Sequence, residues 1–214
     1  MSKSNKYGYS GVDIPTQAFQ ANVGKFDPSE INELIANNQW TQYGQLELIE
    51  TKVANATNID FTSIQESTYN VHFATYNNIQ FTADAYLAGQ FSNDGGSSFE
   101  SGTDYSYGRR YGVEEGSAGH SKSASATGID FSGNGGAANE THNGYVYFYN
   151  LGNPSKYSFA THHSAQMNSS GQFLFYYGGA VYEVAETINA IRFKVNTGAM
   201  DNGTISLYGI KEYI

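Results

Sequence analysis

The 214-residue sequence contains no cysteine, only three prolines and few charged residues, which make up 14% of the chain. The absence of cysteine excludes disulfides, thiolate metal ligands and cysteine nucleophiles. The 11 basic residues are outnumbered by 20 acidic ones, so the net charge is −9, and Arg109-Arg110 is the only adjacent basic pair. No surface for neutralising phosphates is therefore expected, and we do not expect nucleic acid as a partner.

Long hydrophobic runs are also missing. The strongest apolar stretch, Tyr145–Tyr149, is far too short to cross a bilayer. The first ten residues have a weakly basic start but no apolar core of the kind found in a signal peptide. We therefore expect synthesis in the cytoplasm, without a membrane anchor or a membrane partner.

Aromatic residues (15%) and glycines (24) are abundant, which favours strands joined by turns. Apolar residues alternate with polar ones in 68–76, 187–196 and 204–210, and this period of two indicates strands with one buried face. Residues 92–144 look rich in loops, with 112–125 small and polar. We predict a mostly β protein in which residues 44–214 form a jelly-roll-like β-sandwich.

The N-terminal part has a different pattern. Residues 1–26 contain isolated apolar residues without helical or strand spacing, so we expect an extended arm. Asp27, Pro28 and Glu30 predict the start of one short helix over 27–39. We interpret residues 1–43 as a docking segment. The candidate partner-docking residues are Tyr7, Tyr9, Val12, Ile14, Phe19 and Phe26.

Motifs for catalysis are absent from the sequence. His162 and His163 would point to opposite faces of one strand, and no H-x-H, H-E-x-x-H, nucleophile-elbow or P-loop pattern occurs. The histidines are expected at the surface or in hydrogen bonds. We predict no catalytic residue, metal or cofactor. A calcium site in loops 94–104 or 130–140, which offer carboxylates and amide oxygens, remains an alternative.

Two groups of tyrosines differ in what they predict. Tyr105, Tyr107, Arg109 and Tyr111 lie among loop residues and form a candidate glycan-binding surface, because exposed rings offer contact area at low entropic cost. Packing within the sheet explains this cluster equally well. For Tyr145–Tyr149, ordinary packing on the two faces of a sheet is the expectation.

Two stretches resemble known proteins. Ile188–Phe193 together with residues 202–210 (NGTISLYGI) resembles the closing hairpin of a β-sandwich module found in structural proteins of tailed phages, especially marine phages. Tyr7–Pro15, Asp27–Leu34 and Trp40–Glu50 resemble the start of virion structural proteins in marine tailed phages that infect cyanobacteria and similar hosts.

The resemblance implies a non-enzymatic structural component of a phage particle, such as a capsid decoration, neck, baseplate or tail-appendage protein. It would be assembled in the host cytoplasm, anchored by its N-terminal segment, and would contact other virion proteins as a homo-oligomer. The alternative is a carbohydrate-binding module that recognises glycans of the host surface.

Overall fold

The computed structural model describes residues 28–36, 46–116, 118–135 and 139–211. The chain divides into two units, Met1–Gly44 and Gln45–Ile214. In the first unit, helix α1 spans Pro28–Ala36, inside the expected range 27–39. The six candidate docking residues and the expected helix cap Asp27 lie outside the described residues. Among the described helical residues, no stretch is long and apolar enough to cross a membrane.

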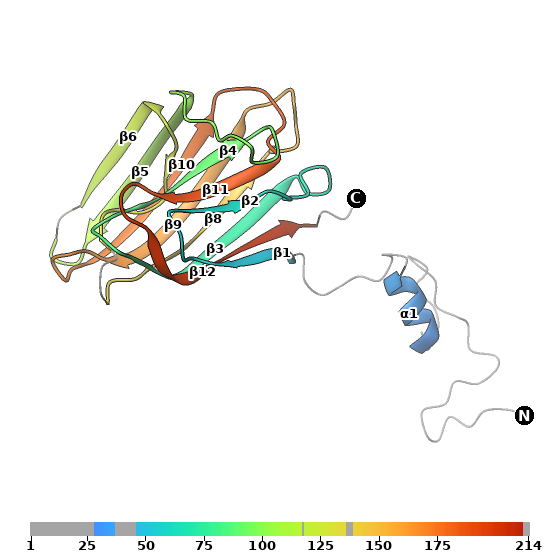
Figure 1. Cartoon of the computed structure of the whole chain (residues 1–214), viewed down its shortest axis with the longest axis horizontal. Helices are drawn as coiled ribbons and strands as arrows, with labels where there is room; N and C mark the ends of the chain where they lie inside the picture. Colours follow the sequence, from blue (N-terminus) through green and yellow to red (C-terminus); the bar gives the residue numbers. More distant parts are fainter. Residues whose placement is uncertain (1–27, 37–45, 117, 136–138, 212–214) are drawn as a thin grey trace, which may run out of the picture. The chain divides into compact units, whose positions relative to one another are not determined.

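The second unit is a sandwich of two antiparallel sheets, which confirms the predicted fold class (Figure 1). The larger sheet has eight strands, in the order β1 (Leu46–Val53), β12 (Met200–Ile210), β3 (Val71–Phe81), β8 (His142–Tyr149), β9 (Ser158–Met167), β10 (Phe173–Tyr182), β5 (Tyr105–Val113) and β6 (Ala118–Ala126). The smaller sheet has four, in the order β2 (Asn58–Phe61), β11 (Ala190–Val195), β4 (Leu87–Ser92) and β7 (Ile129–Asp130).

The strand order is that of a jelly roll with additions. Strands β2, β11, β4 and β7 form one sheet, and β3, β8, β5 and β6 belong to the other, so the chain passes repeatedly between the layers. The hairpin β9–β10 is inserted between β8 and β5, and β12 and β1 extend the opposite edge. The added hairpin widens the larger sheet by two strands.

Aromatic rings fill the space between the sheets. Phe131, Phe148 and Phe193 are completely buried, and their ring centroids lie 5.6 to 6.4 Å apart. Ile205 and Leu207 point inward from β12, as the alternation predicts. Rings at these separations add stability beyond the area that they bury.

Three local predictions were wrong. Residues 112–125 are not a loop, because Ala118–Ala126 pairs with β5 as edge strand β6. The apolar residues of 81–91 predict one further strand, but this stretch is divided, because β3 ends at Phe81 in the larger sheet and β4 begins at Leu87 in the smaller one. The expected closing hairpin does not form: β11 and β12 belong to different sheets, and residues 201–203 lie within β12, where the pairing with β3 is irregular.

Candidate functional site

The candidate glycan-binding residues all lie on β5, but Tyr105 is buried in the core and the other three are not. Tyr107, Arg109 and Tyr111 all point toward the side of the smaller sheet, where they oppose Ser123, Ser121 and Gly119 of β6. Tyr105 is fully buried; its hydroxyl accepts a hydrogen bond from Phe91 N–H and lies 3.3 Å from the Glu100 carbonyl oxygen. Tyr105 is therefore a core residue and offers no surface to a glycan.

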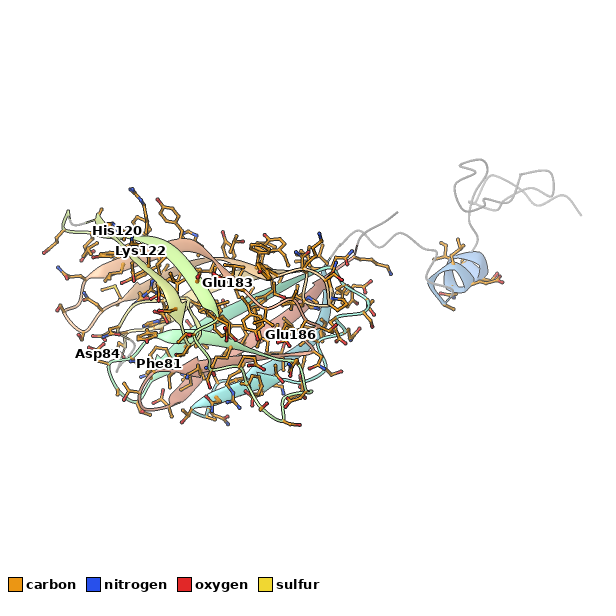
Figure 2. The ribbon with its side chains drawn as sticks, turned by 90° about the horizontal axis from the view of Figure 1, so that it is seen from above. Phe81, Asp84, His120, Lys122, Glu183 and Glu186 are labelled. Carbon is orange, nitrogen blue, oxygen red and sulfur yellow. The ribbon has the colours of Figure 1, made fainter. Side chains whose placement is uncertain are left out.

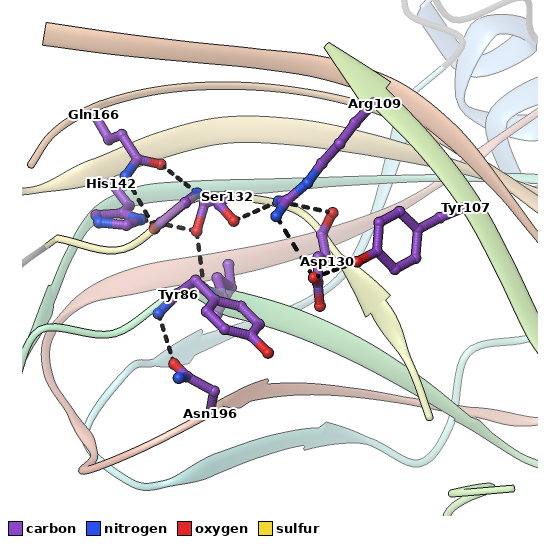
Figure 3. Close-up of polar contacts among 10 residues, drawn as sticks. Tyr86, Tyr107, Arg109, Asp130, Ser132, His142, Gln166 and Asn196 are labelled. Atoms are coloured by element: carbon purple, nitrogen blue, oxygen red, sulfur yellow. Dashed lines mark hydrogen bonds and ion pairs between the residues drawn. The ribbon is translucent and has the colours of Figure 1, made fainter. Parts of the chain in front are cut away.

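Arg109 joins the two sheets (Figure 3). Its Nη1 donates hydrogen bonds to the backbone carbonyls of Ser132 and Asp130, and its Nη2 lies 3.5 Å from Asp130 Oδ2. The guanidinium also lies 4.8 Å from the ring centroid of Tyr176. The Arg109 side chain is only 8% exposed. The arginine proposed from the sequence as a ligand contact is thus occupied within the fold.

Asp130 and Tyr107 border a polar cleft of about 430 Å³, whose other lining residues include Tyr86, Ser123, Thr127, Lys194 and Asn196. Tyr107 donates its hydroxyl hydrogen to Asp130 Oδ2 at 3.0 Å. Burial raises the pKa of Asp130, while the charge of Arg109 and the hydrogen bond from Tyr107 act in the opposite direction. Of the four residues predicted to bind glycan, Tyr107 is the one that lines this cleft.

A second polar group lies deeper, next to Phe131 (Figure 3). The Ser132 hydroxyl is 2.9 Å from His142 Nδ1 and accepts a hydrogen bond from Leu87 N–H. Gln166 binds both the N–H and the C=O of Gly133. Ser132 and His142 are completely buried, so the hydroxyl is not placed to meet a substrate. These contacts hold segment 130–135 against β8 and β9.

We expect Ser132→Ala to lower the free energy of unfolding by about 1–3 kcal/mol, because a buried backbone donor loses its acceptor. Urea unfolding measures this change, and the exposed Ser125→Ala variant is the control. Equal stability of the two variants would show that the Ser132 hydroxyl does not hold this segment.

His162 departs from the expectation that the histidines lie at the surface or in hydrogen bonds. His72 and His142 are buried but each makes a hydrogen bond through one ring nitrogen, whereas neither ring nitrogen of the buried His162 has a partner of normal geometry among the described residues. Burial lowers the pKa of His142 to about 3 and that of His162 to about 4. His163 is exposed on the opposite face, as the alternation predicts. Buried neutral histidines make the fold sensitive to acid.

The two loops considered for calcium contain no metal cage in the part that the structure describes. No group of three His, Asp or Glu side chains lies close enough to hold an ion among those residues. The Asp94 carboxylate instead accepts hydrogen bonds from Ser98 and Ser92, and the bonds from Ser98 and then Ser92 lower its pKa to about 2. Asp94 therefore stabilises its own turn.

The outer face of the larger sheet carries a second and broader surface. Tyr145, Tyr147 and Tyr149 all point outward from β8, while Val146 and Phe148 between them are fully buried. Exposed rings continue on the neighbouring strands: Phe159 is 43% exposed and Tyr177 is 49% exposed. We define the aromatic face as Phe73, Tyr145, Tyr147, Tyr149, Phe159, Phe175 and Tyr177.

The run Tyr145–Tyr149 occupies both faces of the sheet, as expected, and all three tyrosines lie on the outer one. The three tyrosine rings contact one another along this face: Tyr145 and Tyr147 are T-shaped with centroids 5.9 Å apart, and Tyr147 and Tyr149 stack at 6.4 Å. Phe73 of β3 adds a ring 4.6 Å from Tyr147. The sequence indicated one shared side for these rings, but not that this side is the outer one.

Comparisons with models of protein families, with curated proteins and with solved structures found no match for this chain.

Proposed function

We propose that this protein is a non-enzymatic structural component of a phage particle, in which the N-terminal segment attaches the chain and the sandwich presents the aromatic face. The division of the chain after Gly44 supports this proposal, because it separates the segment expected to dock from the folded sandwich. The sequence resemblance of both ends of the chain to virion proteins favours a particle component, while β11 and β12 do not form the closing hairpin of the module that the C-terminal end resembles. Other virion proteins would be the partners, in a homo-oligomeric assembly.

The observation that carries the proposal is the aromatic face itself. A sheet face with Tyr145, Phe159, Phe175 and Tyr177 between 37% and 49% exposed is unusual for a domain that acts alone, since exposed apolar patches mark interaction sites. The Arg109 side chain, by contrast, is occupied by hydrogen bonds and an ion pair that connect the two sheets.

Deletion of residues 1–26 is expected to abolish incorporation into particles while the melting temperature of the sandwich changes by only a few degrees, because the strands and their core lie in 46–211. The measurement is the amount of tagged protein in particles purified from cells that lack the untagged copy. Full-length Lys156→Gln, a change in an exposed loop outside the aromatic face, is the control and should still be incorporated. Equal incorporation of the truncated protein would contradict an N-terminal anchor.

The second candidate function is recognition of glycans, and a specific feature favours it. Tyrosine rings exposed beside hydroxyl and imidazole groups, as at Tyr145, Tyr177 and His163, combine an apolar platform with hydrogen-bonding groups. The two functions are compatible, since a particle component can also bind the host surface.

A further inference from the structure

Two hollows lie side by side on the aromatic face. The first, of about 440 Å³, is lined by Ser106, Gly108, Phe159, Thr161, Gly179, Val181 and adjoining backbone. The second, of about 460 Å³, is lined by Tyr145, Tyr147, Tyr149, Thr161, His163, Tyr177 and adjoining backbone. Because both include Thr161, we treat them as one trough that crosses β5, β10, β9 and β8.

The floor of the trough contains glycines that the fold does not require. Gly108, Gly179 and Thr161 follow one another across the strands in register. A Cβ atom at Gly108 would have no atom within 4 Å, and one at Gly179 would meet nothing nearer than 3.4 Å. Neither glycine has a positive φ. Glycine weakens a strand, and at these two positions it leaves the outer side of the backbone open to the close approach of a ligand.

The walls of the trough supply rings and polar groups. On one side, Tyr177 opposes His163, which in turn opposes Tyr145. On the other side, Phe159 opposes Tyr149, whose hydroxyl lies 3.1 Å from the Thr161 hydroxyl. Such walls suit a pyranose chain, because the C–H faces of sugar rings pack on aromatic rings while their hydroxyls bind the polar edges.

The charge at one end of the trough is opposite to that of the chain. Lys122 of β6 lies beside Gly108, and Arg110 lies beside His120, all on the outer side (Figure 2 labels Lys122 and His120). Strands β5, β6, β8, β9 and β10 contain no Asp or Glu, and the glutamates that directly follow the ends of β5 and β10 are Glu114, Glu115 and Glu183. In a chain of net charge −9, this basic end favours an anionic ligand.

We propose that the trough binds a linear anionic polysaccharide across the strands, with its acidic groups toward Arg110 and Lys122 and its sugar rings against Tyr177 and Tyr149. This rests on the second candidate function and names its site and ligand class. Three strand spacings amount to about 14 Å, which is comparable to the length of a trisaccharide.

The experiment is isothermal titration of the full chain with galacturonate oligomers, from monomer to hexamer, and with neutral dextran oligomers of the same lengths. We expect affinity to rise up to the trimer and then level off. Gly179→Leu should weaken binding of the trimer at least about tenfold by filling the floor, without lowering the melting temperature, because the position is open and leucine suits a strand better than glycine.

Two further pairs of variants have matched controls. Tyr177→Ala should weaken binding at least about fivefold, whereas Leu48→Ala, which removes an exposed apolar side chain at the far edge of the same sheet, should not. Lys122→Gln should weaken binding of galacturonate and reduce its salt dependence, whereas Lys156→Gln in an exposed loop should do neither.

The experiment distinguishes a failure of the trough as the binding site from a failure of glycan recognition as a whole. Binding of either glycan series that is unaffected by Gly179→Leu overturns the trough and leaves glycan recognition standing. Equal binding of galacturonate and dextran overturns the anionic ligand. If neither series binds, or if Gly179→Leu instead dissolves an oligomer seen by light scattering, the proposal is wrong and the face joins protein chains. Preference for a single-stranded oligonucleotide over galacturonate also overturns it.

Discussion

Replacing Arg109 with methionine is expected to lower the free energy of unfolding by about 3–5 kcal/mol. Methionine keeps much of the apolar volume next to Tyr176, so the loss comes from the charge. Without the guanidinium, the Asp130 carboxylate stays largely buried without its counterion, and the carbonyl of Ser132 loses a donor. Chemical unfolding in urea measures the change.

The neighbouring Arg110 is a matched control for this variant. It has the same chemistry but points to the outer face, where it is exposed. Arg110→Met should change the stability by less than about 0.5 kcal/mol. If the two variants were equally stable, Arg109 would not join the sheets, and it would again become a candidate for contact with a ligand.

Acid is expected to destabilise the sandwich well above the usual range of carboxylate titration. His142 and His162 stay neutral in the fold, with pKa values of about 3 and about 4, whereas in the unfolded chain histidine takes up a proton near pH 6.5. Their contribution is thus complete above pH 6.5 and is lost as the pH falls toward the folded values. At pH 5 the loss amounts to about 2 kcal/mol for each histidine.

A pair of variants at adjacent residues tests whether the buried histidines cause this sensitivity to acid. His162→Leu removes one of the three buried histidines whose pKa is lowered, so the loss of stability between pH 7 and pH 5 should shrink by about 2 kcal/mol. His163→Leu, on the exposed face, should leave the pH dependence unchanged. Melting temperatures recorded across this range provide the measurement. An unchanged slope in His162→Leu would show that other groups cause the sensitivity.

The regular part of the fold was predictable because alternation marks a buried face directly. The stretches 68–76, 187–196 and 204–210 overlap strands β3, β11 and β12. Strand β6 was missed, since Ala118–Ala126 has no large apolar residue to alternate and forms through its backbone pairing with β5 at the sheet edge. The sheet that each strand joins depends on contacts between distant residues, which is why the expected hairpin of β11 and β12 did not form.

The candidate surfaces were predictable only in part, for the same reason. Alternation places Tyr107, Arg109 and Tyr111 on one side, but it does not reveal that Arg109 meets Asp130 of β7. It likewise groups Tyr145, Tyr147 and Tyr149 without telling which side is solvent. The glycine floor arises from the register of β5 with β10, a pairing between residues far apart in the sequence.

We propose that the outer face of the larger sheet binds the ligand, whereas Arg109 on the inner side is structural. The most direct measurement is an amide chemical-shift titration of the isotope-labelled full chain with galacturonate trimer. If the trough binds the trimer, the shifts should be concentrated at Gly108, Thr161 and Gly179 on its floor. Shifts concentrated instead at Thr127, Asp130 and Asn196 would place the ligand in the polar cleft and contradict this proposal.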